Sequence, residues 1–531
     1  MTDQEARIEE LENEIRKRDN TILLQQNSID ELKHQVENLT EMVLKMRHDR
    51  FGSSSERTRL SDDLDDDQLC FFNEAEVLQD PDAEEPVKQD PKGRIRKKSK
   101  RKDMIIGDIP VEEVPVEPDK DQLSCPYCRN KLKPVGTEVV REEIQYIPAS
   151  LKLLRYVRKT YGCPHCKNTD HPYMLKPIAP ASLLNHSIAS PSSVAWVMCQ
   201  KYANALPLYR QEDEWKRMGI RLSRATMANW VIRCSDDYFD VLIRHMHEKL
   251  LEREVLHADE TPVQVLKEDG KPAESKSYMW LYRTGNDGRV PIILYDYKPS
   301  RSGENAEEYL EGFHGYLHSD GYSGYNRLTD VTRCGCWAHL RRKFVEAIPK
   351  GKASGPGGTN AETGRNYCDR LFNIEGELKD LSPEDRKRER LDRETPVLEA
   401  FWSWLDTLTP LSGSNLAKAV IYAKNQKPYM ENYLLDGRCS ISNNAAENGI
   451  RPFVVGRKNW LFSDTPKGAD ASARVYSLIE TAKANGLDPF TYLSLLLKYM
   501  PDWDHTEEML ENMMPWSDFI RQQSSKPDGK K

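Results

Sequence analysis

The sequence predicts an α/β fold in which a mixed β-sheet carries helices on its faces, with several further segments in front of it. Three observations lead to this prediction: a seven-residue apolar repeat near the N-terminus, two Cys-x-x-Cys pairs, and a series of strand-like runs that starts after residue 254. The chain has 531 residues, too many for one compact core, so two or more domains with linkers are expected.

Residues 1–50 are predicted to form a coiled coil. Between Ile8 and Met46, isoleucine or valine fills every seventh position of one seam, and leucine or methionine fills most positions of the other. β-Branched residues at the first seam position with leucine at the second favour two parallel strands. We therefore expect a homo-oligomer that assembles through this segment. The alternative is one long amphipathic helix that packs on its own chain.

Residues 51–103 are predicted to be a linker, because their apolar content is too low for a core. Within it, residues 62–90 carry twelve acidic side chains and one basic one, whereas residues 93–102 carry seven basic side chains and no acidic one. The net charge of −8 therefore hides a basic block that is able to contact DNA phosphates. A solvated tail is an equally good interpretation, and the two blocks could also pair with each other.

Residues 104–178 are predicted to form a small zinc-ribbon-like domain. Its two knuckles, CPYC and CPHC, provide four thiolates, which suit the tetrahedral, sulfur-rich coordination of one structural Zn²⁺. The runs TEVVREEIQYI and LKLLRYVRKTYG between them are predicted to be strands that bring the knuckles together. A redox dithiol is the competing interpretation. The expected ligands are Cys125, Cys128, Cys163 and Cys166.

Residues 179–252 are predicted to be helical, with Ser223 as the N-cap of one helix. Two helices joined by a short turn that contains Gly219 are typical of a helix-turn-helix, in which Arg224, Thr226 and Asn229 would face DNA. Two ordinary packed helices joined by a turn explain the same pattern without DNA binding.

After residue 254 the runs VLHADETPVQVL, SYMWLYRTG and RVPIILYDYK indicate successive strands, and a helix-like GENAEEYLEGF precedes a further strand, GYLHSD. Asp259 lies in the first of these strands, and Asp320 is expected to end the fourth. If the two strands lie side by side, both carboxylates reach the same edge of the sheet. Each aspartate alone is more commonly a turn or capping residue.

Two neighbouring carboxylates do not both stay ionised without a cation, because like charges at short range raise the pKa of one of them. Mg²⁺ or Mn²⁺ accepts carboxylate oxygens, and two such ions about 4 Å apart are able to act on a phosphodiester. The run SNNAAENGIRPF offers a third ligand, since Asn444, Glu447 and Arg451 share one helix face. A surface pair between Glu447 and Arg451 is the alternative.

The chain resembles the transposases of insertion-sequence family sixty-six, a branch of the DDE (Asp-Asp-Glu) transposases. The likeness rests on four motifs in one order: LHADETPVQVL, HSDGYSGYNRL, CWAHLRRKF and NNAAENGIRPFVVGRKNWLF. It implies a ribonuclease-H-like catalytic core over residues 253–480, with a helical insertion at about 345–440. Residues 481–531 then form a C-terminal helical element and tail.

The resemblance also implies a role for each acid: Asp259 and Asp320 are the first two metal ligands and Glu447 is the third. The chain departs from the family pattern at Asn448 and Gly449, where the pattern has arginine and alanine, and glycine is the weaker helix former.

Several residues near the three acids are candidates for secondary roles. Basic side chains expected to contact DNA are Arg341, Arg342, Lys343, Arg451, Arg457 and Lys458. His257 lies two residues before Asp259 and either contacts metal or phosphate or is a buried core histidine, the more common case. Trp460 offers a stacking surface for a base, unless it is buried.

These features predict a DNA transposase that cleaves phosphodiester bonds and transfers 3′ ends to target DNA with two Mg²⁺ or Mn²⁺ ions. Expected partners are DNA and, by resemblance, accessory proteins of the element. The predicted location is the cytoplasm, at the nucleoid, because no run reaches the roughly 18 apolar residues of a membrane span and no secretory signal is evident. The alternatives are a nuclease without strand transfer and a catalytically inactive, zinc-dependent DNA-binding protein derived from a transposase. A coiled-coil scaffold would leave the acidic motifs without a purpose.

Overall fold

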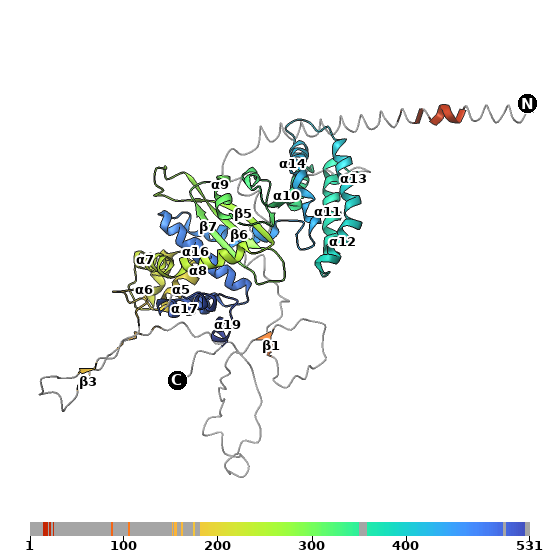
Figure 1. Cartoon of the computed structure of the whole chain (residues 1–531). Coiled ribbons are helices and arrows are strands. Elements are labelled where there is room, and N and C mark those ends of the chain that lie inside the picture. Colours follow the sequence, from red (N-terminus) through yellow and green to blue (C-terminus); the bar gives the residue numbers. More distant parts are fainter. Residues whose placement is uncertain are drawn as a thin grey trace, which may run out of the picture. The chain divides into compact units, whose positions relative to one another are not determined.

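The computed structural model describes residues 181–349, 358–502 and 506–525, together with short stretches nearer the N-terminus (Figure 1). Contacts divide the chain into two units, one made of Met1–His48 and Leu151–Lys531 and the other of Asp49–Ser150. The second unit is represented by β1 (Val87–Lys88) and β2 (Ile105–Ile106), which pair in parallel. All further elements belong to the first unit.

Most of the predicted coiled coil and most of the predicted linker lie outside the described residues, and so do the four cysteines predicted to bind zinc. Within the heptad region, residues 14–19, 21, 22 and 25 are helical. Their two seam isoleucines, Ile15 and Ile22, are 57% and 56% exposed on the single chain. Oligomerisation through this segment therefore stays a prediction.

The strand predicted over residues 151–162 is wrong for most of the residues that the structure describes there. Residues 151, 153, 154 and 156 are irregular, and β3 (Tyr161–Gly162) pairs instead with β4 (Met174–Leu175) in antiparallel orientation. The physical reason is exposure: Leu153 and Tyr156 are 81% and 76% exposed, so these apolar side chains have no buried face against which a strand would pack.

Between residue 181 and the sheet, the structure has four α-helices. Ser190 begins the first of them with a reciprocal capping box to Ser193. The predicted N-cap at Ser223 is confirmed, since its side chain accepts a hydrogen bond from the Thr226 N–H at 3.1 Å. Gly219, with φ of +91°, makes the turn before it, a conformation that favours glycine. The helices are α5 (Pro191–Tyr202), α6 (Leu208–Arg217), α7 (Arg224–Cys234) and α8 (Asp240–Leu251).

The predicted mixed sheet is confirmed, with five strands in the order β7-β6-β5-β8-β9. Within this sheet, β6 pairs antiparallel with both β5 and β7, whereas β8 and β9 run parallel to β5. The fifth strand, a three-residue strand, was not predicted. The strands are β5 (Val255–Gln264), β6 (Lys276–Thr284), β7 (Ile293–Lys298), β8 (Tyr316–His318) and β9 (Thr332–Cys334), with α9 (Gly303–Tyr309) between β7 and β8.

Helix α16 (Pro466–Ala484) covers the free edge of the sheet at β7. The backbone N–H groups of Ile293 and Tyr295 donate to the hydroxyls of Thr481 and Ser477 at 3.0 and 2.7 Å, which satisfies groups that an edge strand otherwise exposes. The C-terminal helices α17 (Pro489–Tyr499), α18 (Glu507–Asn512) and α19 (Asp518–Ser524) follow, and α17 packs on α5.

Helix α15 (Asn444–Trp460) packs on β5 and β6 and continues through Gly449 without a break. Gly449 is buried, and a Cβ at this position would lie 3.3 Å from both methyl carbons of Leu281. The side chain of Tyr295 donates a hydrogen bond to the Gly449 carbonyl. The weak helix former is therefore compensated by a close approach between helix and sheet.

Helices fill the region in which an insertion at 345–440 was predicted (Figure 1). They enclose a second hydrophobic core that includes Trp337, Phe344 and Phe401. The helices are α10 (Trp337–Ala347), α11 (Asn360–Leu378), α12 (Pro383–Arg393), α13 (Thr395–Asp406) and α14 (Asn415–Met430), followed by a 3₁₀ turn at Asn432–Leu435. Among the residues that the structure describes, none of the helices is both long and apolar enough to span a bilayer.

Candidate functional site

The parallel pairing of β5 and β8 places Asp259 and Asp320 at one level of the sheet. His257 on β5 is the register partner of His318 on β8, and each aspartate follows its histidine by two residues. Because the two strands run in the same direction, the residues that follow the two histidines lie toward the same edge of the sheet. The expectation that the two acids meet at one edge therefore agrees with the strand register.

Asp320 lies beyond its strand, so the prediction that it ends the fourth strand is wrong. Strand β8 stops at His318, and Asp320 begins a turn in which its Oδ1 accepts a hydrogen bond from the Tyr322 N–H at 2.8 Å. Aspartate favours such turns, since its side chain bonds the backbone two residues on. The Asp320 carbonyl in turn accepts a hydrogen bond from Arg333 at 2.9 Å, which fixes the turn.

Asp259 lies near other acids at this edge of the sheet, because their charges change its pKa. Burial raises the pKa of Asp259 well above its ordinary value, and the charges of Glu260, Asp320 and Glu447 raise it further. A hydrogen bond from the Glu260 N–H to Asp259 Oδ1, at 2.9 Å, opposes this shift. Glu447 is 127 residues from Asp320 in the chain (447 − 320), so the fold brings together groups that are remote in sequence.

Glu447 lies in the first turn of α15 and faces α10. Its side chain is 25% exposed, with Oε1 3.6 Å from His339 Nδ1 and Oε2 3.4 Å from Arg342 Nη2. Burial lowers the pKa of His339, while Glu447 and Asp320 raise it. The ligand atoms of Cys336, His339 and Glu447 all lie within 4.8 Å of one another, so this side of the site also has the composition of a metal-binding group.

Asn443 connects the strand of the first acid to the helix of the third. Its side chain is fully buried; Nδ2 donates to the Ala258 carbonyl at 2.8 Å, and Oδ1 lies 3.0 Å from His257 Nδ1. Its backbone N–H donates to Cys336 Sγ at 3.2 Å. The sequence reasoning missed this residue, although the doublet Asn443-Asn444 inside a long motif was a usable signal.

His257 is a buried histidine of the core, which confirms the second of its two interpretations. It is 1% exposed, and its ring stacks on that of His318 with centroids 4.4 Å apart. Burial lowers the pKa of His257 to about 4, against the hydrogen bond that Asn443 Oδ1 accepts from Nδ1, which raises it. The imidazole is therefore neutral and is held by its neighbours.

Glu260 is a second buried acid that the sequence reasoning did not identify. Its side chain is 1% exposed, is paired with Arg301 and accepts a hydrogen bond from the Tyr325 hydroxyl at 2.7 Å. Burial and Asp320 raise the pKa of Glu260, while Tyr325 and Arg301 lower it. The Asp-Glu pair in the motif LHADETPVQVL was the signal for this residue.

The basic cluster on α10 divides between the site and the insertion. Arg342 is 56% exposed and faces Glu447. Arg341 is paired with Asp369 of α11 at 2.5 Å, and Lys343 Nζ lies 4.9 Å from the ring centroid of Tyr422. Of the three basic residues, Arg342 is therefore the one whose described contact is with an acid of the site.

The basic residues of helix α15 differ in their exposure to solvent. Arg451 and Lys458 are exposed, whereas Arg457 is half-buried and donates to Thr261 Oγ1 at 3.2 Å. Trp460 is half-buried in an aromatic cluster, 6.3 Å from Tyr476 by ring centroids and with Lys201 Nζ 4.1 Å above its ring. Its packing explains Trp460 without a stacked base.

On α7 two of the three predicted DNA-contacting residues are on the surface. Arg224 and Asn229 are exposed, while Met227 and Trp230 are buried. Thr226 is half-buried, and its hydroxyl lies 2.9 Å from that of Ser223. Both polar side chains are accessible, as a recognition helix requires, but an ordinary surface helix has the same pattern.

The acids fit a divalent cation. Asp259 is buried among other carboxylates that raise its pKa, and Glu447 Oε1 is a buried oxygen that has no hydrogen-bond partner among the described atoms. A cation compensates both the repulsion and the missing partner, and hard ions such as Mg²⁺ and Mn²⁺ prefer carboxylate oxygens. Asp259, Asp320 and Glu447 are the residues able to hold it.

Comparison with known families gives matches along most of the chain. A model described as transposase IS66 family matches residues 186–471, which include all three acids, and the IS66 C-terminal element matches residues 477–516. The zinc-finger binding domain of transposase IS66 matches residues 122–167, which span the four predicted zinc ligands. A model described as transposase C of IS166 homeodomain matches residues 38–114.

Relatives of similar length occur in Sinorhizobium fredii. The chain is 29% identical over 503 residues to the uncharacterized protein y4qI, a match that covers 91% of this chain and 89% of the relative. It is 27% identical over 520 residues to the uncharacterized protein y4jD, covering 92% of this chain and 97% of that protein. The similarity therefore covers about nine tenths of this chain.

Proposed function

The chain belongs to the IS66 family of transposases, and from this premise we propose that it cleaves DNA at the ends of its element and joins the freed 3′ ends to target DNA. The observation that supports the proposal is the parallel register of β5 and β8, which sets Asp259 and Asp320 at one edge of the sheet, together with the charge of Glu447, which raises the pKa of Asp259. Strands that place two acids side by side, and a helix that adds a third, suit the chemistry of a phosphodiester.

The sheet supports the proposal of a ribonuclease-H-like core. In chain order its strands are arranged 3-2-1-4-5, with the first three antiparallel and the last two parallel to the first. This arrangement sets Asp259 on the central strand and Asp320 after its parallel neighbour. The insertion that follows β9 then returns the chain to α15, where Glu447 lies in the first turn.

The proposed metal ligands are Asp259, Asp320 and Glu447. Mg²⁺ or Mn²⁺ bound there supplies Lewis acidity, which makes the attacking oxygen more nucleophilic and stabilises the leaving one. Protein side chains orient the ligands: Asn443 joins β5 to the start of α15, and His339 and Arg342 contact the Glu447 carboxylate. Because Arg301 neutralises Glu260, the excess negative charge is left on the three ligands.

Other parts of the chain would hold the DNA. We assign phosphate contacts to the exposed Arg342 on α10 and to the exposed Arg451 and Lys458 on α15, and element-end contacts to Arg224 and Asn229 on α7. Arg341, Lys343 and Arg457 are engaged within the protein and would contribute through a shift of their present partners. The zinc-finger segment and the oligomer formed by the heptad region would complete the complex of two element ends.

Substitution of one acid tests the proposal. With a DNA fragment that carries the inverted repeats flanking the coding region, Asp259→Asn should abolish Mg²⁺-dependent cleavage and leave binding of the same fragment largely unchanged. Asp330→Asn is the matched control, since Asp330 is an exposed aspartate of the same core. Full cleavage by Asp259→Asn would refute the assignment.

A second assay separates transposition from simple hydrolysis. Pre-cut element ends are supplied together with supercoiled target DNA, and joined products are counted. A transposase joins the ends, whereas a nuclease with the same site leaves them free. Binding without cleavage in either assay would favour a DNA-binding protein that has lost its activity.

A further inference from the structure

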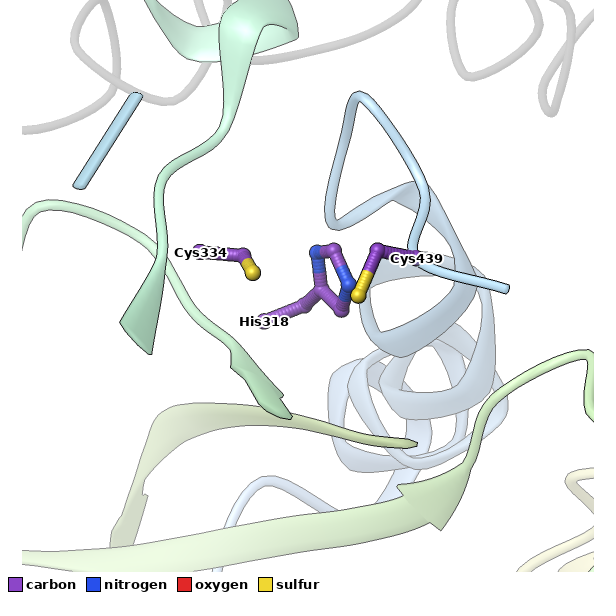
Figure 2. Close-up of side chains that lie close together, drawn as sticks. All are labelled: His318, Cys334 and Cys439. Atoms are coloured by element: carbon purple, nitrogen blue, oxygen red, sulfur yellow. The ribbon is translucent and has the colours of Figure 1, made fainter. Parts of the chain in front are cut away.

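A second group of metal-binding side chains lies away from the three acids. His318, Cys334 and Cys439 are 0%, 0% and 1% exposed, and their ligand atoms all lie within 4.8 Å of one another. Figure 2 shows the side chains of His318, Cys334 and Cys439, which lie close together. None of the three residues was singled out by the sequence, because they are 16 (334 − 318) and 105 (439 − 334) residues apart.

The fold sets the geometry of this group from the backbone. His318 and Cys334 are register partners on the adjacent parallel strands β8 and β9, so their side chains point to the same face. Cys439 approaches from the segment between the 3₁₀ turn and α15, where its carbonyl accepts a hydrogen bond from the buried Arg390 at 2.9 Å. Three separate segments thus meet at one buried point.

One ring nitrogen of His318 is available for a ligand, and the other makes a single long hydrogen bond. Nδ1 has no hydrogen-bond partner among the described atoms, and Nε2 is engaged by the Ser440 N–H at 3.3 Å, the long end of the hydrogen-bond range. A buried polar atom without a partner is costly, and a native structure that contains one calls for an explanation. Coordination of a metal ion would satisfy it.

Two other buried cysteines of the described chain can be compared with Cys334 and Cys439. Cys234 and Cys368 are each 0% exposed, and neither belongs to a group of three metal-binding side chains within the parts of the chain that the structure describes. Free cysteine commonly behaves as a small apolar residue, and this interpretation suffices for both. It does not explain two thiols gathered around an unsatisfied imidazole.

We propose that His318, Cys334 and Cys439 bind one zinc ion, in addition to the zinc of the predicted Cys₄ site. Thiolate and imidazole are the ligands that zinc prefers, and two thiolates with one neutral imidazole balance the charge of Zn²⁺ in a buried place. Binding releases the two thiol protons to solvent, and a small ligand such as water takes the fourth position. No carboxylate takes part, which separates this site from that of Mg²⁺ or Mn²⁺.

The position of the site indicates what such an ion would do. Asp320 follows His318 by two residues, and Glu447 follows Cys439 by eight (447 − 439). A zinc ion would tie the strand before the second acid to the segment before the third, and so hold the two ends of the helical insertion together. This consequence rests on the proposed function, whereas the zinc site itself does not.

Zinc content of the full-length protein tests the inference, with Cys368→Ala as the matched control for Cys439→Ala. The wild-type chain and the control are expected to retain two zinc ions each after exhaustive dialysis, and Cys439→Ala one. Equal zinc content in all three proteins would overturn the proposal. So would a disulfide between Cys334 and Cys439, detected by mass spectrometry in the freshly purified wild-type protein.

A second variant keeps the inference testable if Cys439→Ala fails to fold. Removal of the predicted finger with Cys125→Ala and Cys128→Ala should leave one zinc ion per full-length chain. Its X-ray absorption spectrum should show two sulfur ligands and a histidine nitrogen. Absence of zinc, or an all-sulfur spectrum, would overturn the proposal. Neither measurement uses DNA, so failure here and failure of the proposed transposase activity are distinguishable.

Discussion

Nδ1 of His339 lies 3.6 Å from Oε1 of Glu447, and neither atom has a hydrogen-bond partner within the described part of the chain. The contact joins α10, the first helix of the second hydrophobic core, to the helix that carries the third acid. His339 thus acts on the proposed site through Glu447 and is a positioning residue.

His339→Ala should lower the rate of DNA cleavage roughly 10- to 100-fold, the usual cost of losing a partner of a metal ligand. The reason is a less well oriented Glu447, so the Mg²⁺ or Mn²⁺ concentration for half-maximal cleavage should rise as well. Titration of the metal in the cleavage assay measures both effects. The control is His314→Ala, at an exposed position. An unchanged metal dependence would leave His339 with a structural role alone.

Asn443→Ala should destabilise the protein by about 1–3 kcal/mol, because the Ala258 carbonyl and His257 Nδ1, both buried, are left without their hydrogen bonds to the Asn443 side chain. Denaturant unfolding of the full-length chain gives the change in the free energy of unfolding. Asn444→Ala, at the neighbouring exposed position, should change it by less than about 0.5 kcal/mol. Equal effects of the two substitutions would contradict the bridging role of Asn443.

The mixed sheet was predictable because period-two runs separated by turn residues indicate strands of a half-buried sheet. Three errors show where this reasoning stops. β9 is three residues long, which is too short for a periodic pattern, and Asp320 lies in a turn whose start depends on the hydrogen bond to Tyr322. Residues 151–156 have strand-like composition, but exposed side chains such as Leu153 gain nothing from pairing.

The sequence predicted the acids of the candidate site, but it did not predict the residues that contact and orient those acids. Asn443, His339 and Glu260 stand in long motifs, as the acids do, but they acquire their roles from contacts across elements that are distant in the chain. The group of His318, Cys334 and Cys439 is the extreme case, since strand register and one loop bring it together. Patterns within a sequence report such tertiary contacts weakly.

Arg390→Met should destabilise the helical insertion by about 3–5 kcal/mol, since Arg390 is 1% exposed and its loss leaves the Glu375 carboxylate without its bidentate partner. The carbonyls of Tyr433 and Cys439 lose their donors as well. Arg388→Met, with a side chain 70% exposed, is the control and should change stability little. Thermal unfolding followed by circular dichroism compares the two, and equal melting temperatures would contradict the prediction.

Arg224→Ala should weaken binding of element-end DNA and reduce the slope of log affinity against log salt by about 0.9, the contribution of one phosphate contact. The side chain is exposed on α7, and nothing in the core depends on it. Fluorescence anisotropy at several salt concentrations measures the slope. Arg244→Ala, on α8 with a side chain 70% exposed, should leave it unchanged. A slope that stays the same in Arg224→Ala would exclude a phosphate contact at this position.

Glu394 should make the stability of the insertion depend on pH. It is 0% exposed and accepts a hydrogen bond from the Tyr433 hydroxyl at 2.5 Å; burial, followed by the charge of Glu375, raises the pKa of Glu394 to about 8. The folded state therefore holds a proton that the unfolded chain releases near its ordinary pKa of 4.5. Stability from this group is complete below pH 4.5 and is lost as the pH rises toward 8.

Glu394→Gln should remove this dependence, because glutamine still accepts the Tyr433 hydrogen bond and carries no charge at any pH. Between pH 5 and 8 the free energy of unfolding of the variant, relative to that of the wild type, should rise by up to about 1.4 kcal/mol per pH unit. This is the free energy equivalent of one unit of pKa. Melting temperatures at unit pH intervals give the comparison. Glu399→Gln, at an exposed position of the same helix α13, should follow the wild type throughout. If Glu394→Gln runs parallel to the wild type as well, the carboxyl group is ionised in the folded protein and the buried proton is absent.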